Sequence, residues 1–219
     1  MFRLFERCDR WADGWYRAEK ISLMQTAAGR VLEIGAGTGV NFPYLNKDCE
    51  VVCVEPNVLM HERLRKHAAE AGITIEILDS KAESLPIPDA SMDFVVGTLV
   101  LCSVDNVAKV LDEVARVLKP GGQYVFIEHV RGTRTMLFFQ RLLSLPWRVV
   151  FGNCHLTRDP RDKFAIQEQF EVVARPINIG PWWIPIRPHL VGQATKKISR
   201  SGNDPHMTNE CVDAIHRRA

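Results

Sequence analysis

Three glycines at alternate positions follow a short apolar segment near the start of the chain. Residues 31–34 read Val-Leu-Glu-Ile, and Gly35, Gly37 and Gly39 come directly after them. Glycine permits a tight turn and lets a ligand lie against the backbone, where any side chain would collide. Open α/β sheets bind ligands in such loops, at the carboxyl ends of their strands. The spacing therefore predicts a ligand-binding loop over residues 35–39.

Two acidic residues indicate which ligand this loop would hold. Glu33 lies two positions before Gly35, where a carboxylate suits a cationic amino group and repels a pyrophosphate. Dinucleotide-binding loops follow the pattern GxGxxG, and Val40 stands where their third glycine is needed. Glu55 ends the next apolar segment, where a carboxylate can accept both hydroxyls of a ribose. An amino-acid cation and a ribose together describe S-adenosylmethionine; the plainer alternative is a structural turn beside a surface acid.

The segments around this loop alternate between strand and helix patterns. Short apolar runs predict five strands, at residues 30–34, 51–54, 73–78, 93–99 and 123–129. Helices are expected to begin at residues 40–45 and to cover residues 57–71 and 104–118. Asn57 caps the second of these helices and Gly72 ends it, while residues 120–122, Pro-Gly-Gly, predict a turn. Strands joined through helices favour a parallel, doubly wound sheet.

After the fifth strand the pattern changes. Residues 133–151 predict an apolar helix that Pro146 breaks or kinks. Residues 170–174 and 190–195 predict two closing strands, joined by a segment rich in proline and tryptophan. The polar end of the chain predicts a short peripheral helix over residues 209–217.

Composition and charge exclude several classes of protein. The chain has 219 residues, 46% hydrophobic and 25% charged, which fits one soluble α/β domain. A net charge of +2 without a long basic run argues against nucleic acid as a partner. No stretch approaches the ~20 apolar residues of a membrane span, and the first residues have no signal-peptide core. We therefore expect a cytoplasmic protein without a transmembrane segment.

The first residues predict an amphipathic helix. Phe2, Phe5 and Trp15 are apolar among arginines and acidic residues. A helix packed over the domain is favoured over an anchor at a membrane surface, so peripheral membrane contact stays an alternative.

The cysteines predict neither a metal site nor a disulfide framework. They are Cys8, Cys49, Cys53, Cys102, Cys154 and Cys211. No CxxC pair and no Cys/His spacing typical of a zinc site occurs, so no metal site is expected. Scattered thiols indicate a reducing compartment, and Cys102 and Cys154 are interpreted as small buried hydrophobic side chains.

Several motifs together make the chain similar to class I S-adenosylmethionine-dependent methyltransferases. They are residues 33–39, Glu55 at a strand end, Leu85-Pro86 followed by Ser91-Met92-Asp93, and the Leu-Lys-Pro-Gly-Gly run at 118–122. The resemblance implies a Rossmann-like α/β fold, with a seven-stranded, mostly parallel sheet, helices on both faces and an antiparallel last strand. It also implies one methyltransferase domain over residues 1–197, with a helical cap over 1–28 and a polar tail over 198–219.

The same resemblance implies S-adenosylmethionine as the cofactor and assigns its contacts. The cofactor-binding residues would be Glu33, Gly35, Ala36, Gly37, Gly39, Glu55, Pro56, Ala82, Glu83, Thr98 and Leu99. Glu33 and the glycine loop would hold the methionine part, Glu55 the ribose, and residues 81–83 would lie beside the adenine. Related sequences often have Asp where Lys81 stands. Lysine cannot accept from the adenine amino group, so Glu83 or a backbone carbonyl is expected to do so.

A finer resemblance involves the second half of the chain. Residues 98–104, 128–130, 153–158 and 187–192 are similar to the methyltransferase-like alkyl-thiol methyltransferases of animals. This implies S-methylation of a small thiol. The animal members carry an apolar N-terminal membrane anchor, which is not expected in this chain.

Four residues are candidates for the acceptor side. Methyl transfer from a sulfonium is an in-line displacement, so alignment and exclusion of water matter most. A thiol acceptor must be mostly thiolate, for which a modest base suffices. Glu128 and His129, at the end of the fifth strand, are the leading candidates, followed by His155 and His189 in the expected lid. For these two histidines, a structural, hydrogen-bonded role is the favoured alternative.

The aromatic side chains of the second half leave two interpretations open. Trp182 and Trp183, with Phe138, Phe139 and Trp147, would either wall an apolar acceptor pocket or pack between helix and sheet.

Three functions remain to be weighed. The favoured one is methylation of a small-molecule thiol. The alternatives are C- or O-methylation of a quinone-like or other ring, and a non-catalytic protein that binds S-adenosylmethionine. A nicotinamide-dependent oxidoreductase is disfavoured because Val40 breaks the required glycine spacing.

Overall fold

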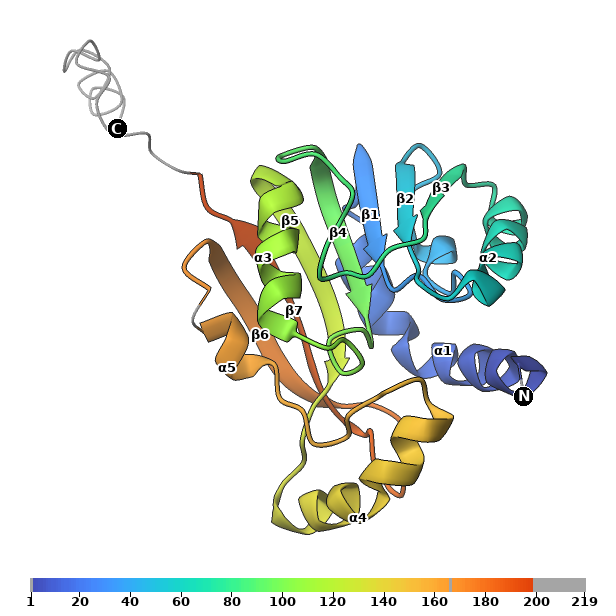
Figure 1. Cartoon of the computed structure of the whole chain (residues 1–219), viewed down its shortest axis with the longest axis vertical. Coiled ribbons are helices and arrows are strands. Elements are labelled where there is room, and N and C mark those ends of the chain that lie inside the picture. The colour runs from blue at the N-terminus through green and yellow to red at the C-terminus, as the bar shows by residue number, and fades with distance from the viewer. Residues whose placement is uncertain (1, 166, 199–219) are drawn as a thin grey trace, which may run out of the picture.

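One seven-stranded sheet forms the frame of the computed structural model, which describes residues 2–165 and 167–198, with only the backbone for residues 2–12. The strands are β1 (Arg30–Ile34), β2 (Glu50–Val54), β3 (Ile75–Leu78), β4 (Met92–Thr98), β5 (Leu118–His129), β6 (Phe170–Asn178) and β7 (Pro188–Lys196). They lie in the order β3-β2-β1-β4-β5-β7-β6 (Figure 1). The first five pair in parallel, and β7 is antiparallel to β5 and β6. The predicted fold class is confirmed.

Helices cover both faces of this sheet (Figure 1). The described helices are α1 (Phe2–Met24), α2 (Val58–Ala71), α3 (Val107–Val117), α4 (Arg134–Val150) and α5 (Arg161–Ala165), with a 3-10 turn η1 (Phe42–Tyr44). Of these, α4 lies at one end of the sheet rather than on a face (Figure 1). One core layer contains Leu111 of α3 and Phe164 of α5, and another contains Leu64 of α2 and Met24 of α1. Burial on both faces explains why the central strands are continuous apolar runs in the sequence.

The helix expected to begin at residues 40–45 is only the short turn η1. Asn41 precedes η1 but makes no side-chain cap hydrogen bond there, because its amide points to Glu33 and Thr98. Beyond the turn, the Asp48 N–H donates to Asn46 Oδ1 at 3.1 Å, a local turn that competes with helix. The helix prediction was wrong because the Asn41 side chain, which suits a helix start, hydrogen-bonds to Glu33 and Thr98 instead.

Two proline-containing segments also differ from expectation. Residues 120–122 were predicted as a turn between elements, but they lie inside β5, where the pairing register with β4 shifts. Gly121 has φ +81° there, a conformation that suits glycine. α4 runs from Arg134 to Val150 with Pro146 inside it, so of the two predicted effects of this proline the break does not occur, and a kink stays a prediction.

The edge at which the parallel strands end carries the loops of functional interest. α1 and α4 lie at this edge, drawn at the bottom of Figure 1. α1 packs on the sheet through Tyr16, which is buried in a cluster with Ile127 and Val191. The residues 199–219 of the expected tail, including its helix at 209–217, lie outside the described residues. Within the described part of the chain, no helix is long and apolar enough to cross a membrane.

Candidate active site

The loop after β1 depends on its glycines. Gly35, Gly37 and Gly39 have φ values of +60°, +54° and +81°, the left-handed region that favours glycine. A Cβ at Gly35 would lie 2.8 Å from Cγ2 of Val100, and one at Gly39 would collide with the ring of Phe42. The loop therefore approaches both neighbours more closely than any other residue type would allow.

Glu55 is fixed at the end of β2 by two backbone donors. The Gly37 N–H donates to its Oε2 at 2.9 Å, and the Asn57 N–H donates to its Oε1 at 2.8 Å. Each carboxylate oxygen can accept a further hydrogen bond, since an ionised carboxylate offers about four acceptor positions. The geometry suits a ligand with two adjacent hydroxyl groups.

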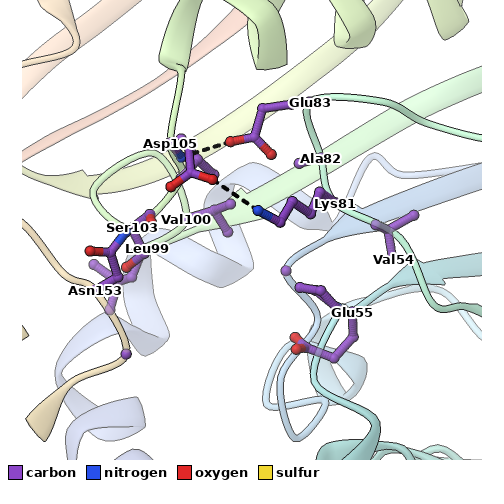
Figure 2. Close-up of a pocket in the computed structure, with 14 residues that line it drawn as sticks. Val54, Glu55, Lys81, Ala82, Glu83, Leu99, Val100, Ser103, Asp105 and Asn153 are labelled. Carbon is purple, nitrogen blue, oxygen red and sulfur yellow. Dashed lines mark hydrogen bonds and ion pairs between the residues drawn. The ribbon is translucent and has the colours of Figure 1, made fainter. Parts of the chain in front are cut away.

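A pocket of about 350 Å³ lies between the ends of β1, β2 and β4 and the loop at residues 152–153 (Figure 2). Six of the eleven expected cofactor residues line it, namely Gly35, Glu55, Pro56, Ala82, Glu83 and Leu99. The other five, Glu33, Ala36, Gly37, Gly39 and Thr98, belong to the same loop or its neighbouring strands but do not line this space. Two of the lining residues, Leu99 and Asn153, have left-handed φ values of +57° and +66°. Such strain costs on the order of 1–3 kcal/mol per residue and is concentrated at functional sites.

One side of the pocket holds a carboxylate that the sequence analysis missed. Lys81 Nζ donates to Asp105 Oδ2 at 2.9 Å across the pocket (Figure 2). Glu83 Oε1 accepts from the backbone N–H groups of Asp105 and Asn106, at 2.7 and 3.2 Å. The hydrogen bond from Lys81 lowers the pKa of Asp105, so this carboxyl is ionised at neutral pH. Only its place just before a helix cap at Asn106 was visible in the sequence.

Glu33 is buried with half of its carboxylate unsatisfied. Asn41 Nδ2 donates to its Oε1 at 2.8 Å, and Oε2 has no hydrogen-bond partner among the described residues. Burial raises its pKa to about 7, and the hydrogen bond from Asn41 and the ammonium of Lys20 oppose this rise. Lys20 is itself buried and pairs with Asp13 at 2.6 Å. A buried acceptor without a partner is costly, so this oxygen suits a cationic ligand group.

Glu128, at the end of β5, shapes the turn that follows β4. Its Oε1 accepts from the N–H groups of Val100 and Leu101, both at 2.9 Å. Its Oε2 has no hydrogen-bond partner among the described residues, and burial raises its pKa to about 8. This carboxyl thus fixes the backbone at Val100, which lines the pocket.

His129 meets two cysteines from distant segments. Its Nε2 lies 2.9 Å from Cys154 Sγ, to which Trp147 Nε1 also donates at 3.3 Å. Hydrogen bonds from Cys102 and His129 lower the pKa of Cys154. The Cys102 thiol also lies 3.2 Å from the carbonyl oxygen of Leu99, a pocket residue. Linear spacing could not reveal this group, because its members follow β4, end β5 and follow α4.

The two remaining histidines occupy different surroundings. His189 is buried, with Nε2 2.9 Å from the Tyr16 hydroxyl and Nδ1 2.9 Å from the Arg187 carbonyl oxygen. An Nδ1–H donor and an Nε2 acceptor satisfy both contacts, and burial lowers its pKa to about 4. His155 lies on the same loop as Asn153, and its backbone N–H donates to the Cys102 carbonyl oxygen at 2.9 Å.

Among the described residues, most of the aromatic side chains of the second half fit neither of the two interpretations that the sequence left open. Trp182 and Trp183 are 80% and 61% exposed, and Phe138 and Phe139 are also exposed. Neither a pocket wall nor packing between helix and sheet describes these four. Trp147 stacks on Phe151 with ring centroids 4.1 Å apart and reaches the site through Cys154.

Known proteins are similar to most of this chain. The family described as "Methyltransferase domain" matches residues 32–126. Thiol S-methyltransferase TMT1B of Rattus norvegicus is 42% identical over 173 residues, 76% of this chain and 70% of the relative. Thiol S-methyltransferase TMT1A of Homo sapiens is 35% identical over 190 residues, 82% of this chain and 78% of the relative.

Solved structures share the fold at low identity. The YcgJ protein of Bacillus subtilis superposes with a TM-score of 0.65 and 19% identity, over 84% of this chain and 99% of that one. A SAM-dependent methyltransferase of Thermotoga maritima gives 0.61 and 24%, over 90% and 100%.

Proposed function

We propose that this chain, which belongs to the thiol S-methyltransferase family of class I S-adenosylmethionine-dependent methyltransferases, methylates the sulfur of a small thiol. The observation that carries the acceptor is the extent of the similarity. The 173 residues aligned with the rat relative exceed the matched domain, and only 31 residues precede that domain. The alignment therefore continues past residue 126, into segments that build the acceptor side.

The residues of the pocket fit S-adenosylmethionine. Its ammonium would lie against the unpartnered Oε2 of Glu33. In the glycine loop, a Cβ at Gly37 would meet only the Gly35 carbonyl oxygen, at 3.9 Å, so the loop is open to a ligand there. Its ribose hydroxyls would reach the two oriented oxygens of Glu55. Thr98, Ala36 and Pro56 complete the surroundings assigned to the cofactor.

The adenine would lie between Ala82 and Leu99, beside the Lys81–Asp105 pair. Lys81 cannot accept a hydrogen bond from the adenine amino group. Asp105 supplies that acceptor instead, because the hydrogen bond from Lys81 holds the Asp105 carboxylate at the pocket. One oxygen of Glu83 accepts from the two backbone N–H groups before α3, those of Asp105 and Asn106. Glu83 therefore contributes to the adenine contact by positioning Asp105.

Bound S-adenosylmethionine supplies an electrophilic methyl carbon: a new bond forms from the acceptor sulfur as the bond to the sulfonium breaks, and its electron pair stays on the departing, neutral sulfur. The chain must orient the acceptor and exclude water. A thiol is a far stronger acid than an alcohol, so a modest base or a positive charge suffices to ionise it, whereas an alcohol needs a strong base.

Side chains at the end of β5 would bound the acceptor position. Glu128 accepts from the N–H of the pocket residue Val100, and His129 contacts Cys154, which follows the pocket residue Asn153. His155 comes next in the chain. The partly buried guanidinium of Arg158 donates to the carbonyl oxygens of Leu101 and Val104, at 2.8 and 2.6 Å. Its positive charge on this side favours a thiolate over a thiol. His189, with both ring nitrogens engaged, would support Tyr16 and α1 rather than touch the acceptor.

The direct test measures demethylated cofactor formed by the purified chain with a simple alkyl thiol and with its alcohol analogue. Turnover on the thiol alone is expected. Turnover on a ring phenol or a quinone-like ring but not on any alkyl thiol would overturn the proposed acceptor, and cofactor binding without turnover on any of these would point to a non-catalytic role.

A further inference from the structure

Cys102, His129 and Cys154 form a compact group of metal-ligating side chains. Their two sulfur atoms and one ring nitrogen all lie within 4.8 Å of one another, and all three residues are buried. Cys102 lies on the turn after β4, His129 is the last residue of β5, and Cys154 lies on the loop after α4. Three separate segments of the chain thus direct their softest donor atoms at one point.

The distances are close to those that a metal ion imposes. With bonds of about 2.3 Å to sulfur and 2.0 Å to nitrogen, tetrahedral zinc holds its donor atoms about 3.5–3.8 Å apart. For a metal ion to bind, the distance of 2.9 Å between His129 Nε2 and Cys154 Sγ must increase by less than 1 Å. The widest distance between two of the three donor atoms, at most 4.8 Å, must decrease by about 1 Å.

Surrounding groups suit thiolate ligands. Trp147 Nε1 donates to Cys154 Sγ at 3.3 Å, and Ser103 Oγ lies 3.4 Å from Cys102 Sγ. Hydrogen bonds of this kind orient metal-bound thiolates and temper their charge. The guanidinium of Arg158 adds a positive charge near both sulfurs.

We propose that Cys102, His129 and Cys154 bind one thiophilic divalent cation, of which zinc is the reference, with one coordination position left open. Three protein ligands of the Cys2His type with a free fourth position are the pattern of catalytic rather than structural zinc sites. The site adjoins the cofactor pocket, because Leu99 and Asn153, which line that pocket, are three residues before Cys102 and one before Cys154.

The open position gives the metal a use in the reaction. An acceptor thiol would bind there as a thiolate and release its proton to solvent, which fixes its sulfur beside the cofactor pocket. This use rests on the proposed function, whereas binding of the metal itself does not.

The test is cobalt binding by the full chain, reduced and stripped of metal. One equivalent of Co²⁺ per chain is expected, with a near-ultraviolet thiolate-to-cobalt charge-transfer band, intense visible bands of a tetrahedral ion, and loss of both on addition of zinc. Addition of an alkyl thiol should shift the visible bands if the fourth position takes the acceptor. This readout requires no turnover, so it can fail or succeed independently of the methylation assay.

Substitutions locate the site. Cys102→Ser and Cys154→Ser should each weaken cobalt binding by on the order of 100-fold and reduce the charge-transfer band. Cys49→Ser is the matched control: Cys49 is also buried and its thiol donates to the Ala27 carbonyl at 3.4 Å, which a hydroxyl can replace. Wild-type protein that binds less than half an equivalent, or binds cobalt without the charge-transfer band, would overturn the proposal even if the serine variants fail to fold. An unchanged band in both serine variants would do so as well.

Discussion

At the scale of single residues, the protonation of the buried Glu33 carboxyl depends on whether a cationic ligand is bound. Burial raises its pKa to about 7, above the value of about 4.3 expected in the unfolded chain. The folded chain therefore holds a proton that the unfolded chain loses, and stability falls as pH rises from about 4.3 to 7. A cationic ligand reverses this balance, because it favours the ionised carboxylate.

Cofactor affinity should therefore depend on pH through Glu33. In calorimetric titrations with S-adenosylmethionine, affinity should rise by up to about tenfold per pH unit below pH 7 and level off above it. Glu33→Gln should remove this slope and weaken binding at pH 8. Glu50→Gln, at the exposed start of β2, is the control and should keep the slope. A Gln variant with the wild-type slope would show that another group carries the dependence.

Glu55 should carry the ribose. Glu55→Ala should weaken binding of the demethylated cofactor by about 2–3 kcal/mol, because a charge-assisted contact to two hydroxyls is lost. Circular dichroism must show an intact fold, since Glu55 also holds the N–H groups of Gly37 and Asn57. Unchanged affinity in isothermal titration would mean that the ribose lies elsewhere.

Asp105 should read the adenine amino group. Wild-type protein should prefer the demethylated cofactor over its inosine analogue, which lacks that group. In Asp105→Ala the two ligands should bind within a factor of about 2, because the charged acceptor for the amino group is lost. Lys81→Ala provides the comparison, as it keeps the carboxylate but removes its partner. A preference that survives in Asp105→Ala would assign the contact to the backbone or to Glu83.

At the scale of elements, local sequence patterns predicted those structures whose causes are local. The helix α2 begins after Asn57, whose side chain accepts from the Leu59 N–H, and ends at Gly72 in the left-handed conformation, as the capping pattern indicated. A helix was predicted where only the turn η1 forms, because the Asn41 amide donates to Glu33 and Thr98. No local sequence pattern reveals such a tertiary contact.

The glycine loop gives a prediction at this scale. Gly35→Ala should destabilise the chain by about 1–3 kcal/mol, because its φ of +60° strains an L residue and its Cβ would meet Val100 at 2.8 Å. Gly14→Ala is the control in helix α1: its Cβ would meet nothing within 4 Å, and the change should stabilise by up to about 1 kcal/mol. Denaturant unfolding measures both. Equal stabilities of the two variants would contradict the conformation of the loop.

At the scale of the whole molecule, the residues proposed to hold the cofactor lie close together in the sequence, whereas those proposed for the acceptor side do not. Glu33, the glycine loop and Glu55 lie within 23 consecutive residues, so their spacing is visible in the sequence. Cys102, His129 and Cys154 are brought together only by the packing of β4, β5 and the loop after α4. The aromatic residues of α4 and its neighbouring loop were judged by type alone, whereas the fold leaves Phe138 and Trp182 exposed.

The order of the sheet explains this difference. β1 and β2 are neighbours in space and close in sequence, while β5 pairs with β7 across residues far apart in the chain. The two halves of the site meet at the shared edge where the parallel strands end (Figure 1). The proposed reaction, between a cofactor held by one half and an acceptor held by the other, would take place at that edge.

The most direct test of sulfur as the acceptor atom uses one small molecule that carries both a thiol and a hydroxyl, such as 2-mercaptoethanol, with S-adenosylmethionine labelled in its methyl group. Mass spectrometry and NMR of the product locate the label within a single acceptor, so differences in binding between two substrates do not enter. Label on sulfur alone is expected, at a rate that saturates with thiol concentration. Label on oxygen, or no labelled product from this or any other alkyl thiol, would contradict it.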